Sequence, residues 1–232
     1  DNYKLKSNEK KFVDSYLSKL PILDKNSIRY ELDSLVYPLY FLDFETYGSA
    51  IPEFDGMKPY SQYPFQFSCH ILDNNNNLSH IEYLHSDNSD PREPLVNKLI
   101  DTCGENGTIV SYNAPFEKGV INKLSQQFPD YKLQLDLINN RFWDQLFIFR
   151  NFYTDYRFKG SNSIKSVLPV LVPNLNYSDL NIQDGIQAQI GWKEMISLDK
   201  GKAKDKLFQQ LLEYCRLDTL AMVEIHKFLD KI

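Results

Sequence analysis

The sequence predicts an α/β fold, a mixed sheet with helices on both faces, from three observations. The run from Leu39 to Phe44 is almost continuously apolar, which is typical of a strand buried on both faces. Alternating residues at 65–72, an asparagine-rich turn and residues 81–84 predict a hairpin. Further along the chain, helix and strand patterns alternate and end in one long helical stretch.

The remaining elements follow from start and stop signals in the sequence. In chain order we expect a helix from Pro91 to Gly104, a strand at 108–112, a helix capped by Asn113, a strand and then a helix within 132–150, a short helix ended by Pro169, a weak helix near 187–196 in an otherwise irregular segment, and the longest helix over 203–229. Residues 1–37 are polar and are interpreted as an N-terminal arm or linker, and residues 38–232 as the domain.

Composition excludes several classes of protein. The net charge of −5 argues against a protein that coats nucleic acid without specificity, because such binding rests on neutralised phosphates. The three cysteines form no pair with metal-ligand spacing, so we expect no disulfide framework and a cytoplasmic location. No apolar segment is long enough for a membrane span and no signal peptide is visible. Because the chain begins with Asp1, further domains of a longer protein are expected as potential partners.

Two carboxylates end the most hydrophobic predicted strand. Asp43 and Glu45 are two residues apart, so their side chains point to the same face of a strand. The two carboxylates repel each other unless a cation lies between them, and hard divalent cations prefer such oxygen ligands. The alternative is two solvent-exposed carboxylates at a strand end, because other acid-x-acid pairs occur at 31/33 and 53/55.

A third carboxylate lies on the long C-terminal helix. Asp218 falls within its apolar stripe, where charges are rarely buried without a partner, and Tyr214 precedes it by one turn. A metal would satisfy Asp218; the alternative is a salt bridge to Arg216, Lys227 or a distant arginine. Glu117 lies in the first turn of another helix, where an acidic residue is also ordinary.

Together these segments resemble the DnaQ-like, or DEDD, exonuclease superfamily. Residues 41–48 (FLDFETYG) resemble its Asp-x-Glu-Thr-x-Gly block, and 109–117 (IVSYNAPFE) its block that usually ends Asn-Ala-x-Phe-Asp. Residues 214–218 (YCRLD) are similar to the Tyr-x-x-x-Asp block of the tyrosine subclass. From Pro38 onward the chain also resembles an uncharacterised bacterial domain family, through PFQFS at 64–68 and SIKSVLP at 163–169.

The resemblance implies a ribonuclease-H-like fold and a 3′–5′ exonuclease that cleaves DNA or RNA with two Mg²⁺ or Mn²⁺ ions. It implies that Asp43, Glu45, Glu117 and Asp218 are metal ligands and catalytic residues. Tyr214 is implied as a fifth catalytic residue, which orients the attacking water. Substrate contacts are expected at Thr46, Asn113, Ser163 and Lys165. Glu117 departs from the aspartate that is usual in the superfamily. The alternatives are an inactive ribonuclease-H-like nucleic-acid-binding module of a larger protein, or a purely structural domain.

Overall fold

The computed structural model describes residues 5–232, and a five-stranded mixed sheet lies at its centre. The strands are β2 (Leu39–Tyr47), β3 (Tyr63–Leu72), β4 (Leu78–Leu84), β5 (Thr108–Ser111) and β6 (Phe142–Asp144). Their order is β4–β3–β2–β5–β6, with β2 antiparallel to β3 and parallel to β5. The predicted α/β class with a mixed sheet is confirmed.

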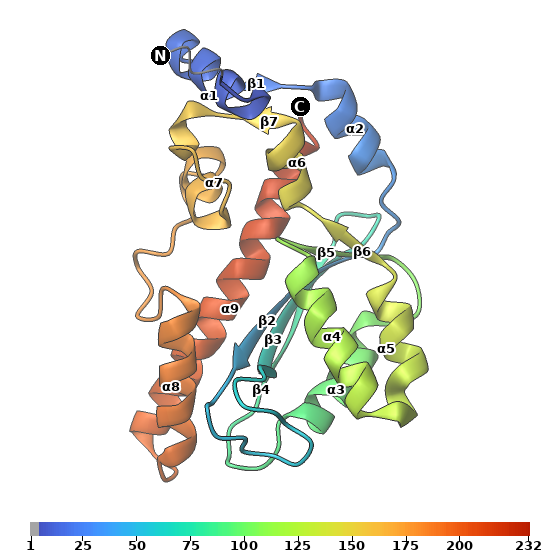
Figure 1. The fold of residues 1–232 in the computed structure, drawn as a ribbon, viewed down its shortest axis with the longest axis vertical. Helices are drawn as coiled ribbons and strands as arrows, with labels where there is room; N and C mark the ends of the chain where they lie inside the picture. The colour runs from blue at the N-terminus through green and yellow to red at the C-terminus, as the bar shows by residue number, and fades with distance from the viewer. Residues whose placement is uncertain (1–4) are drawn as a thin grey trace.

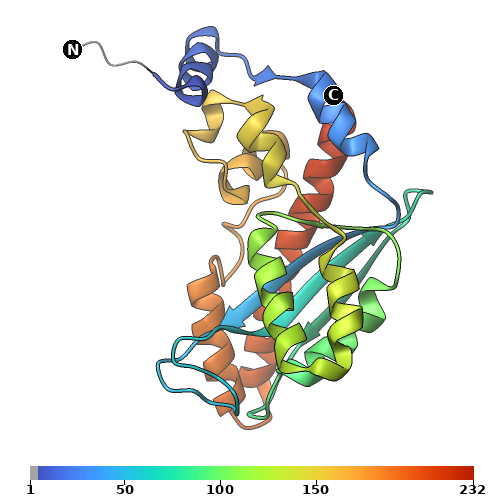
Figure 2. The ribbon, with the colours of Figure 1, turned by 45° about the vertical axis from the view of Figure 1, so that its right-hand side comes forward.

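Helices cover both faces of this sheet (Figures 1 and 2). One face carries α9 (Lys202–Leu229), and the other carries α3 (Arg92–Cys103), α4 (Pro115–Gln127) and α5 (Lys132–Asn139). Successive side chains of β2 point to opposite faces. Leu42 and Phe44 pack in the cluster that includes α3 and α4, whereas Phe41 packs against residues of α9. Asp43 and Glu45 therefore face α9.

The other elements flank the sheet. They are α1 (Ser7–Ser18), β1 (Ile22–Leu23), α2 (Lys25–Asp33), η1 (Pro129–Tyr131), α6 (Leu146–Asn151), β7 (Tyr153–Thr154), η2 (Tyr156–Phe158), α7 (Ile164–Leu171) and α8 (Gly185–Ser197). β1 pairs antiparallel with β7, which joins the N-terminal segment to the region around α6 and α7. Figure 1 shows α8 beside the N-terminal half of α9.

The segment interpreted as an arm, residues 1–37, lies outside the described residues at positions 1–4 and is largely helical beyond them. Ile28 and Leu32 of α2 are 1% and 7% exposed and belong to the same core cluster as the C-terminal part of α9. Few apolar residues in a polar stretch are enough to anchor a short helix when they share one face.

Two local expectations are wrong. Asn113 does not cap α4, because Ala114 occupies the N-cap position. Asn113 instead has a left-handed backbone (φ 85°), and its N–H donates to Asp144 Oδ1 at 2.9 Å. Pro169 does not end α7, which continues to Leu171 because burial of the apolar residues around the proline outweighs one lost backbone hydrogen bond.

Two further features concern the cysteines and the helices. The three cysteines, Cys69, Cys103 and Cys215, are buried and carry free thiols. Within residues 5–232, no helix combines the length and apolar character that crossing a membrane requires.

Candidate functional site

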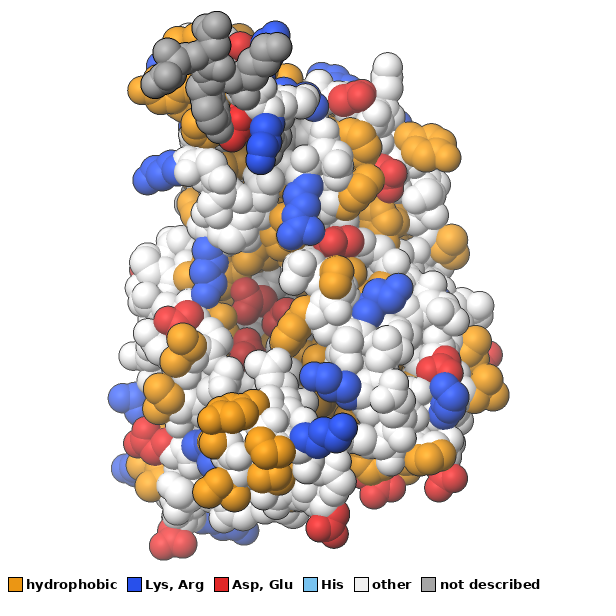
Figure 3. Space-filling model, in the orientation of Figure 1, with side chains coloured by type: hydrophobic (Ala, Val, Ile, Leu, Met, Phe, Trp, Pro, Cys, Tyr) orange, Lys and Arg blue, Asp and Glu red, His pale blue; other side chains and the backbone are white. Residues whose placement is uncertain are grey.

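An acidic cleft of about 610 Å³ opens between β2, the N-terminus of α7, α8 and α9. Asp43 and Glu45 of β2 and Asp218 of α9 line it, and Figure 3 shows acidic side chains on the floor of a hollow with cationic side chains near its rim. The remaining lining residues are Phe44, Thr46, Gln62, Phe116, Ile164, Lys165, Asp184, Gly185, Ile186, Gln189 and Tyr214. The cleft therefore joins residues that are more than 170 positions apart in the sequence.

Three potential metal-ligating atoms lie close together, two of them from residues that line this cleft and one from the buried Cys215 beside it. One carboxylate oxygen from each of Asp43 and Glu45, and Sγ of Cys215, are all within 4.8 Å of one another. The thiol of Cys215 is 3.9 Å from Oδ2 of Asp43. Sequence analysis missed Cys215, because a single cysteine in the apolar stripe of a helix is indistinguishable from an ordinary core residue.

The carboxylates are held in an environment that disfavours their charge. Burial, and then the charges of Asp218, Glu117 and Glu45, raise the pKa of Asp43 well above its usual value. Burial is also the main reason that the pKa of Glu45 rises to about 8 and that of Asp218 to about 6. Within the described residues, the side chain of Glu45 makes no hydrogen bond or ion pair although it is only 7% exposed. A bound cation would compensate this cluster.

Polar side chains surround Asp218. The hydroxyl of Tyr177 donates to Asp218 Oδ1 at 2.7 Å, which favours the charged carboxylate and lowers its pKa. Lys165 Nζ donates to the carbonyl of Gln183 at 2.6 Å and to Oη of Tyr214 at 3.4 Å. Tyr177 was missed because it lies between helices, in a segment without any periodic pattern.

Glu117 differs from the other three carboxylates because it does not line the cleft. It is 2% exposed, its Oε2 has no hydrogen-bond partner among the described residues, and burial raises its pKa to about 8. Its charge still reaches Asp43, whose pKa it raises. Asp144, at the end of β6, raises the pKa of Glu117 and is a further acidic neighbour that sequence analysis missed.

The structure divides the expected substrate contacts into two groups. Thr46 and Lys165 line the acidic cleft with Tyr214. Asn113 and Ser163 instead line an adjoining hollow, and Ile164 belongs to both.

The metal-free protein is expected to lose stability as the pH rises from 6.5 to 8. Glu45 and Glu117 have folded pKa values of about 8 against an ordinary 4.5, so the folded state binds more protons than the unfolded state in this range. Each group can remove up to about 1.4 kcal/mol per pH unit. Buried His70 and partly buried His80, with pKa values lowered to about 3 and 4, make stability rise with pH, but only below about pH 6.5.

Urea unfolding at pH 6.5 and 8 in EDTA would measure this loss. Glu45→Gln should reduce the decline, and Glu105→Gln, on an exposed loop, should not. An unchanged decline in Glu45→Gln would show that Glu45 is not protonated in the folded protein at neutral pH.

Comparison with known proteins identifies relatives but no solved structure. A family model described as "Domain of unknown function (DUF2779)" matches residues 40–163, just over half of the chain. The chain is 25% identical, over 95% of its length, to "Uncharacterized protein MG366" of Mycoplasma genitalium, of which it covers 36%. It is 24% identical, over 83% of its length, to "Uncharacterized protein UU173" of Ureaplasma parvum serovar 3, of which it covers 31%. The chain thus spans about a third of these curated relatives, and no solved structure gives a significant match.

Proposed function

The chain belongs to the DUF2779 family, and from its acidic cleft we propose that it is a metal-dependent nuclease that hydrolyses phosphodiester bonds of DNA or RNA. The observation that carries the proposal is the meeting of Asp43 and Glu45 from β2 with Asp218 from α9 in one cleft. Three carboxylates with raised pKa values, two of them buried and Asp43 partly buried, are costly to the fold, and such clusters are typical of functional sites.

The topology of the sheet supports a more specific assignment of the fold and superfamily. Its central strand β2 is antiparallel to β3, parallel to β5 and followed by helices on both faces, an arrangement consistent with a ribonuclease-H-like fold. On that basis we assign the chain to the DnaQ-like superfamily, tyrosine subclass, as a 3′–5′ exonuclease. Tyr214 lies at the cleft with Asp218 one helical turn later, as this subclass requires.

The residues present fit hard divalent cations. Asp43, Glu45 and Asp218 offer oxygen ligands, and the side chain of Glu45 has no other hydrogen-bond or ion-pair partner among the described residues. Two Mg²⁺ or Mn²⁺ ions bound by Asp43, Glu45 and Asp218, with Glu117 supporting the second, would neutralise the cluster and supply Lewis acidity toward phosphate and water. Deprotonation of the carboxylates would be driven by that binding, because their pKa values are raised in its absence.

The neighbouring side chains would act on substrate and water. Tyr214 would orient the attacking water through its hydroxyl, since an unperturbed phenol is a poor base near neutral pH. Lys165 already lies between Tyr214 and Gln183, where its ammonium could hold a phosphate oxygen. Tyr177 would keep Asp218 charged and correctly oriented.

The proposed function is tested by digestion of end-labelled single- and double-stranded DNA and RNA with Mg²⁺ or Mn²⁺. We expect cleavage that stops in EDTA, and mononucleotides released from 3′ ends. A circular single strand should resist an exonuclease and would be cut by an endonuclease. No cleavage of any substrate with either metal would contradict the proposal.

Mg²⁺ or Mn²⁺ is expected to stabilise the protein against heat. One site at a free metal concentration of 100 times Kd contributes about 2.7 kcal/mol. For a chain of this size that is a Tm increase of roughly 5–10 °C. Differential scanning fluorimetry with and without metal measures the increase, with matched concentrations of K⁺ and Na⁺ salts as controls. No difference between divalent and monovalent salts would argue against the metal site.

A second candidate function is an inactive ribonuclease-H-like module that binds nucleic acid. One observation favours it: Glu117, which replaces the usual aspartate, does not line the cleft. The longer side chain would have to retract to reach the second metal position. This candidate predicts nucleic-acid binding without cleavage, so a binding measurement beside the digestion distinguishes the two.

A further inference from the structure

A second hollow, of about 550 Å³, adjoins the acidic cleft. Ile164, at the start of α7, lines both, so the two form one continuous depression. The other residues that line the second hollow are Tyr112, Asn113, Leu146, Arg150, Asn162 and Ser163. Unlike the acidic cleft, this hollow is lined by no carboxylate from residues 5–232, and its cationic side chain is Arg150.

Arg150 is the cation of the second hollow. It is exposed on α6, and the structure gives its guanidinium no hydrogen bond or ion pair within residues 5–232. Opposite it, Asn113 is exposed and held in its left-handed backbone conformation by the hydrogen bond to Asp144. An arginine without a protein partner beside a pocket is suited to a phosphate group, because its planar fork can donate two hydrogen bonds.

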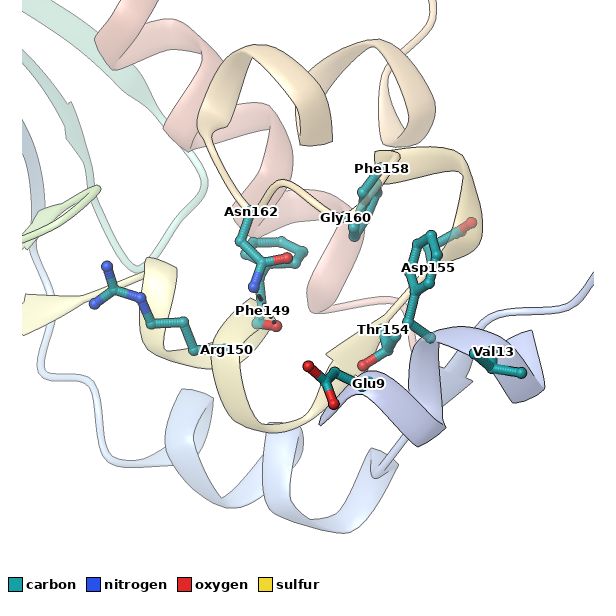
Figure 4. A pocket seen from close by; sticks show the side chains of 10 residues that line it. Glu9, Val13, Phe149, Arg150, Thr154, Asp155, Phe158, Gly160 and Asn162 are labelled. Atoms are coloured by element: carbon teal, nitrogen blue, oxygen red, sulfur yellow. Dashed lines mark hydrogen bonds between the residues drawn. The ribbon is translucent and has the colours of Figure 1, made fainter. Parts of the chain in front are cut away.

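The pocket on the other side of Arg150, beneath α1, differs from the second hollow in its charged residues. This third pocket shares Arg150 and Asn162 with the second hollow but also contains Glu9 and Asp155 (Figure 4). In that view the side chain of Arg150 extends away from Val13 of α1. Asp155 is already paired with Arg157, and among the described residues that line the third pocket no cationic side chain besides Arg150 is present. The third pocket therefore offers a polyanion no further favourable charge. A phosphate chain that follows the depression would therefore be held between Lys165 and Arg150 and would leave before α1.

We propose, on the basis of the nuclease function proposed above, that the second hollow is a subsite for an unpaired nucleic-acid strand, with Arg150 bound to a phosphate next to the scissile one. Phe116 lines the acidic cleft and is 38% exposed, so its ring is accessible to an unpaired base. Bases in a duplex are paired and stacked on one another and cannot stack on such a side chain, whereas a single strand can.

Salt dependence of binding tests the phosphate contact directly. Each phosphate neutralised in a single strand contributes about 0.7 to the slope of log K against log salt concentration. We expect Arg150→Gln to weaken binding of a fluorescein-labelled oligothymidylate about 10-fold, the loss of one charge-assisted hydrogen-bonded contact, and to reduce the slope by about 0.7. Fluorescence anisotropy in Ca²⁺, in place of Mg²⁺ or Mn²⁺, is used so that cleavage does not consume the probe.

Arg216→Gln is the matched control. Arg216 is exposed on α9, makes no hydrogen bond through its side chain or ion pair within the described residues, and lines neither hollow. The same loss of charge there should leave the slope unchanged. A blunt duplex of the same sequence should bind more weakly than the single strand, and its affinity should not depend on Arg150.

An unchanged slope in Arg150→Gln, or equal slopes in both variants, would overturn the subsite even if the protein cleaves nucleic acid. A duplex that binds as tightly as the single strand, with the same dependence on Arg150, would overturn the preference for an unpaired strand. An Arg150-dependent slope without cleavage would support the subsite and contradict the nuclease function, so the two proposals fail separately.

Discussion

Asp43→Asn is expected to reduce phosphodiester cleavage to the background rate and to abolish most of the Tm increase caused by Mg²⁺ or Mn²⁺. Burial and the charges of Asp218, Glu117 and Glu45 raise the pKa of Asp43, so its carboxylate needs a cation to stay charged. Loss of one donor to a developing charge costs about 10²–10³-fold, and loss of a shared metal ligand should cost at least as much. Asparagine keeps the shape of the side chain and removes its charge.

The same variant should be more stable than wild type when metal is absent. Removing one of several repelling charges should contribute roughly 1 kcal/mol, or about 2–4 °C in Tm for a chain of this size. Asp33→Asn is the matched control, because Asp33 belongs to another acid-x-acid pair and is exposed on α2. Activity retained in Asp43→Asn, or equal metal responses in Asp43→Asn and Asp33→Asn, would remove Asp43 from the proposed metal site.

The strongly patterned elements could be predicted from the sequence. The strand expected from Leu39 is β2, and the helix expected at 203–229 is α9, which begins one residue earlier. Both carry long apolar patterns, which are the most reliable local signal. The elements that bear Asp43, Glu45 and Asp218 were therefore predictable, although their meeting depends on the crossing of α9 over the sheet, which no local pattern contains.

The weakly patterned elements could be predicted only in part: a strand and then a helix were expected within 132–150, but the helix α5 that precedes them was not. Within 132–150 the structure has α5, β6 and α6, and β6 is only three partly buried residues long. Such a strand is stabilised by its pairing with β5 rather than by its own sequence. Asp144 ends β6, so its position beside Asn113 and Glu117 depended on an element whose bounds the sequence did not define.

Long-range contacts explain the other omissions in the site. Tyr177 lies in an irregular segment and reaches Asp218 through a contact between residues 41 positions apart. Cys215 contacts Asp43 over 172 positions. In both cases the side chain has an ordinary sequence context, and its relevance follows only from what lies opposite. Asn113 could not be assigned correctly from sequence either. Asparagine favours both helix N-caps and left-handed backbone conformations, so its position before a helix predicts either one.

Tyr214→Phe is expected to fold normally, to keep most of its metal affinity and to lose roughly 10²-fold in turnover, a barrier increase of about 2.7 kcal/mol. Phenylalanine fills nearly the same volume, so the 4% exposed ring should still pack on α9. The hydroxyl lost contacts Lys165 and is proposed to orient the attacking water, and it also lowers the pKa of Asp218, though less than the hydroxyl of Tyr177 does. Steady-state kinetics and calorimetric metal titration of the variant would measure the two effects separately.

Tyr177→Phe is the variant to compare with Tyr214→Phe, because Tyr177 is also a buried tyrosine close to Asp218. Its hydroxyl donates to the carboxylate and lowers the pKa of Asp218, so its loss should make that carboxylate harder to ionise and weaken metal binding. Excess metal should therefore restore turnover in Tyr177→Phe but not in Tyr214→Phe. If Tyr214→Phe cleaves at the wild-type rate, Tyr214 is a packing residue and the assignment to the tyrosine subclass is wrong. If excess metal restores both variants, neither hydroxyl orients the attacking water, and both tyrosines act through Asp218.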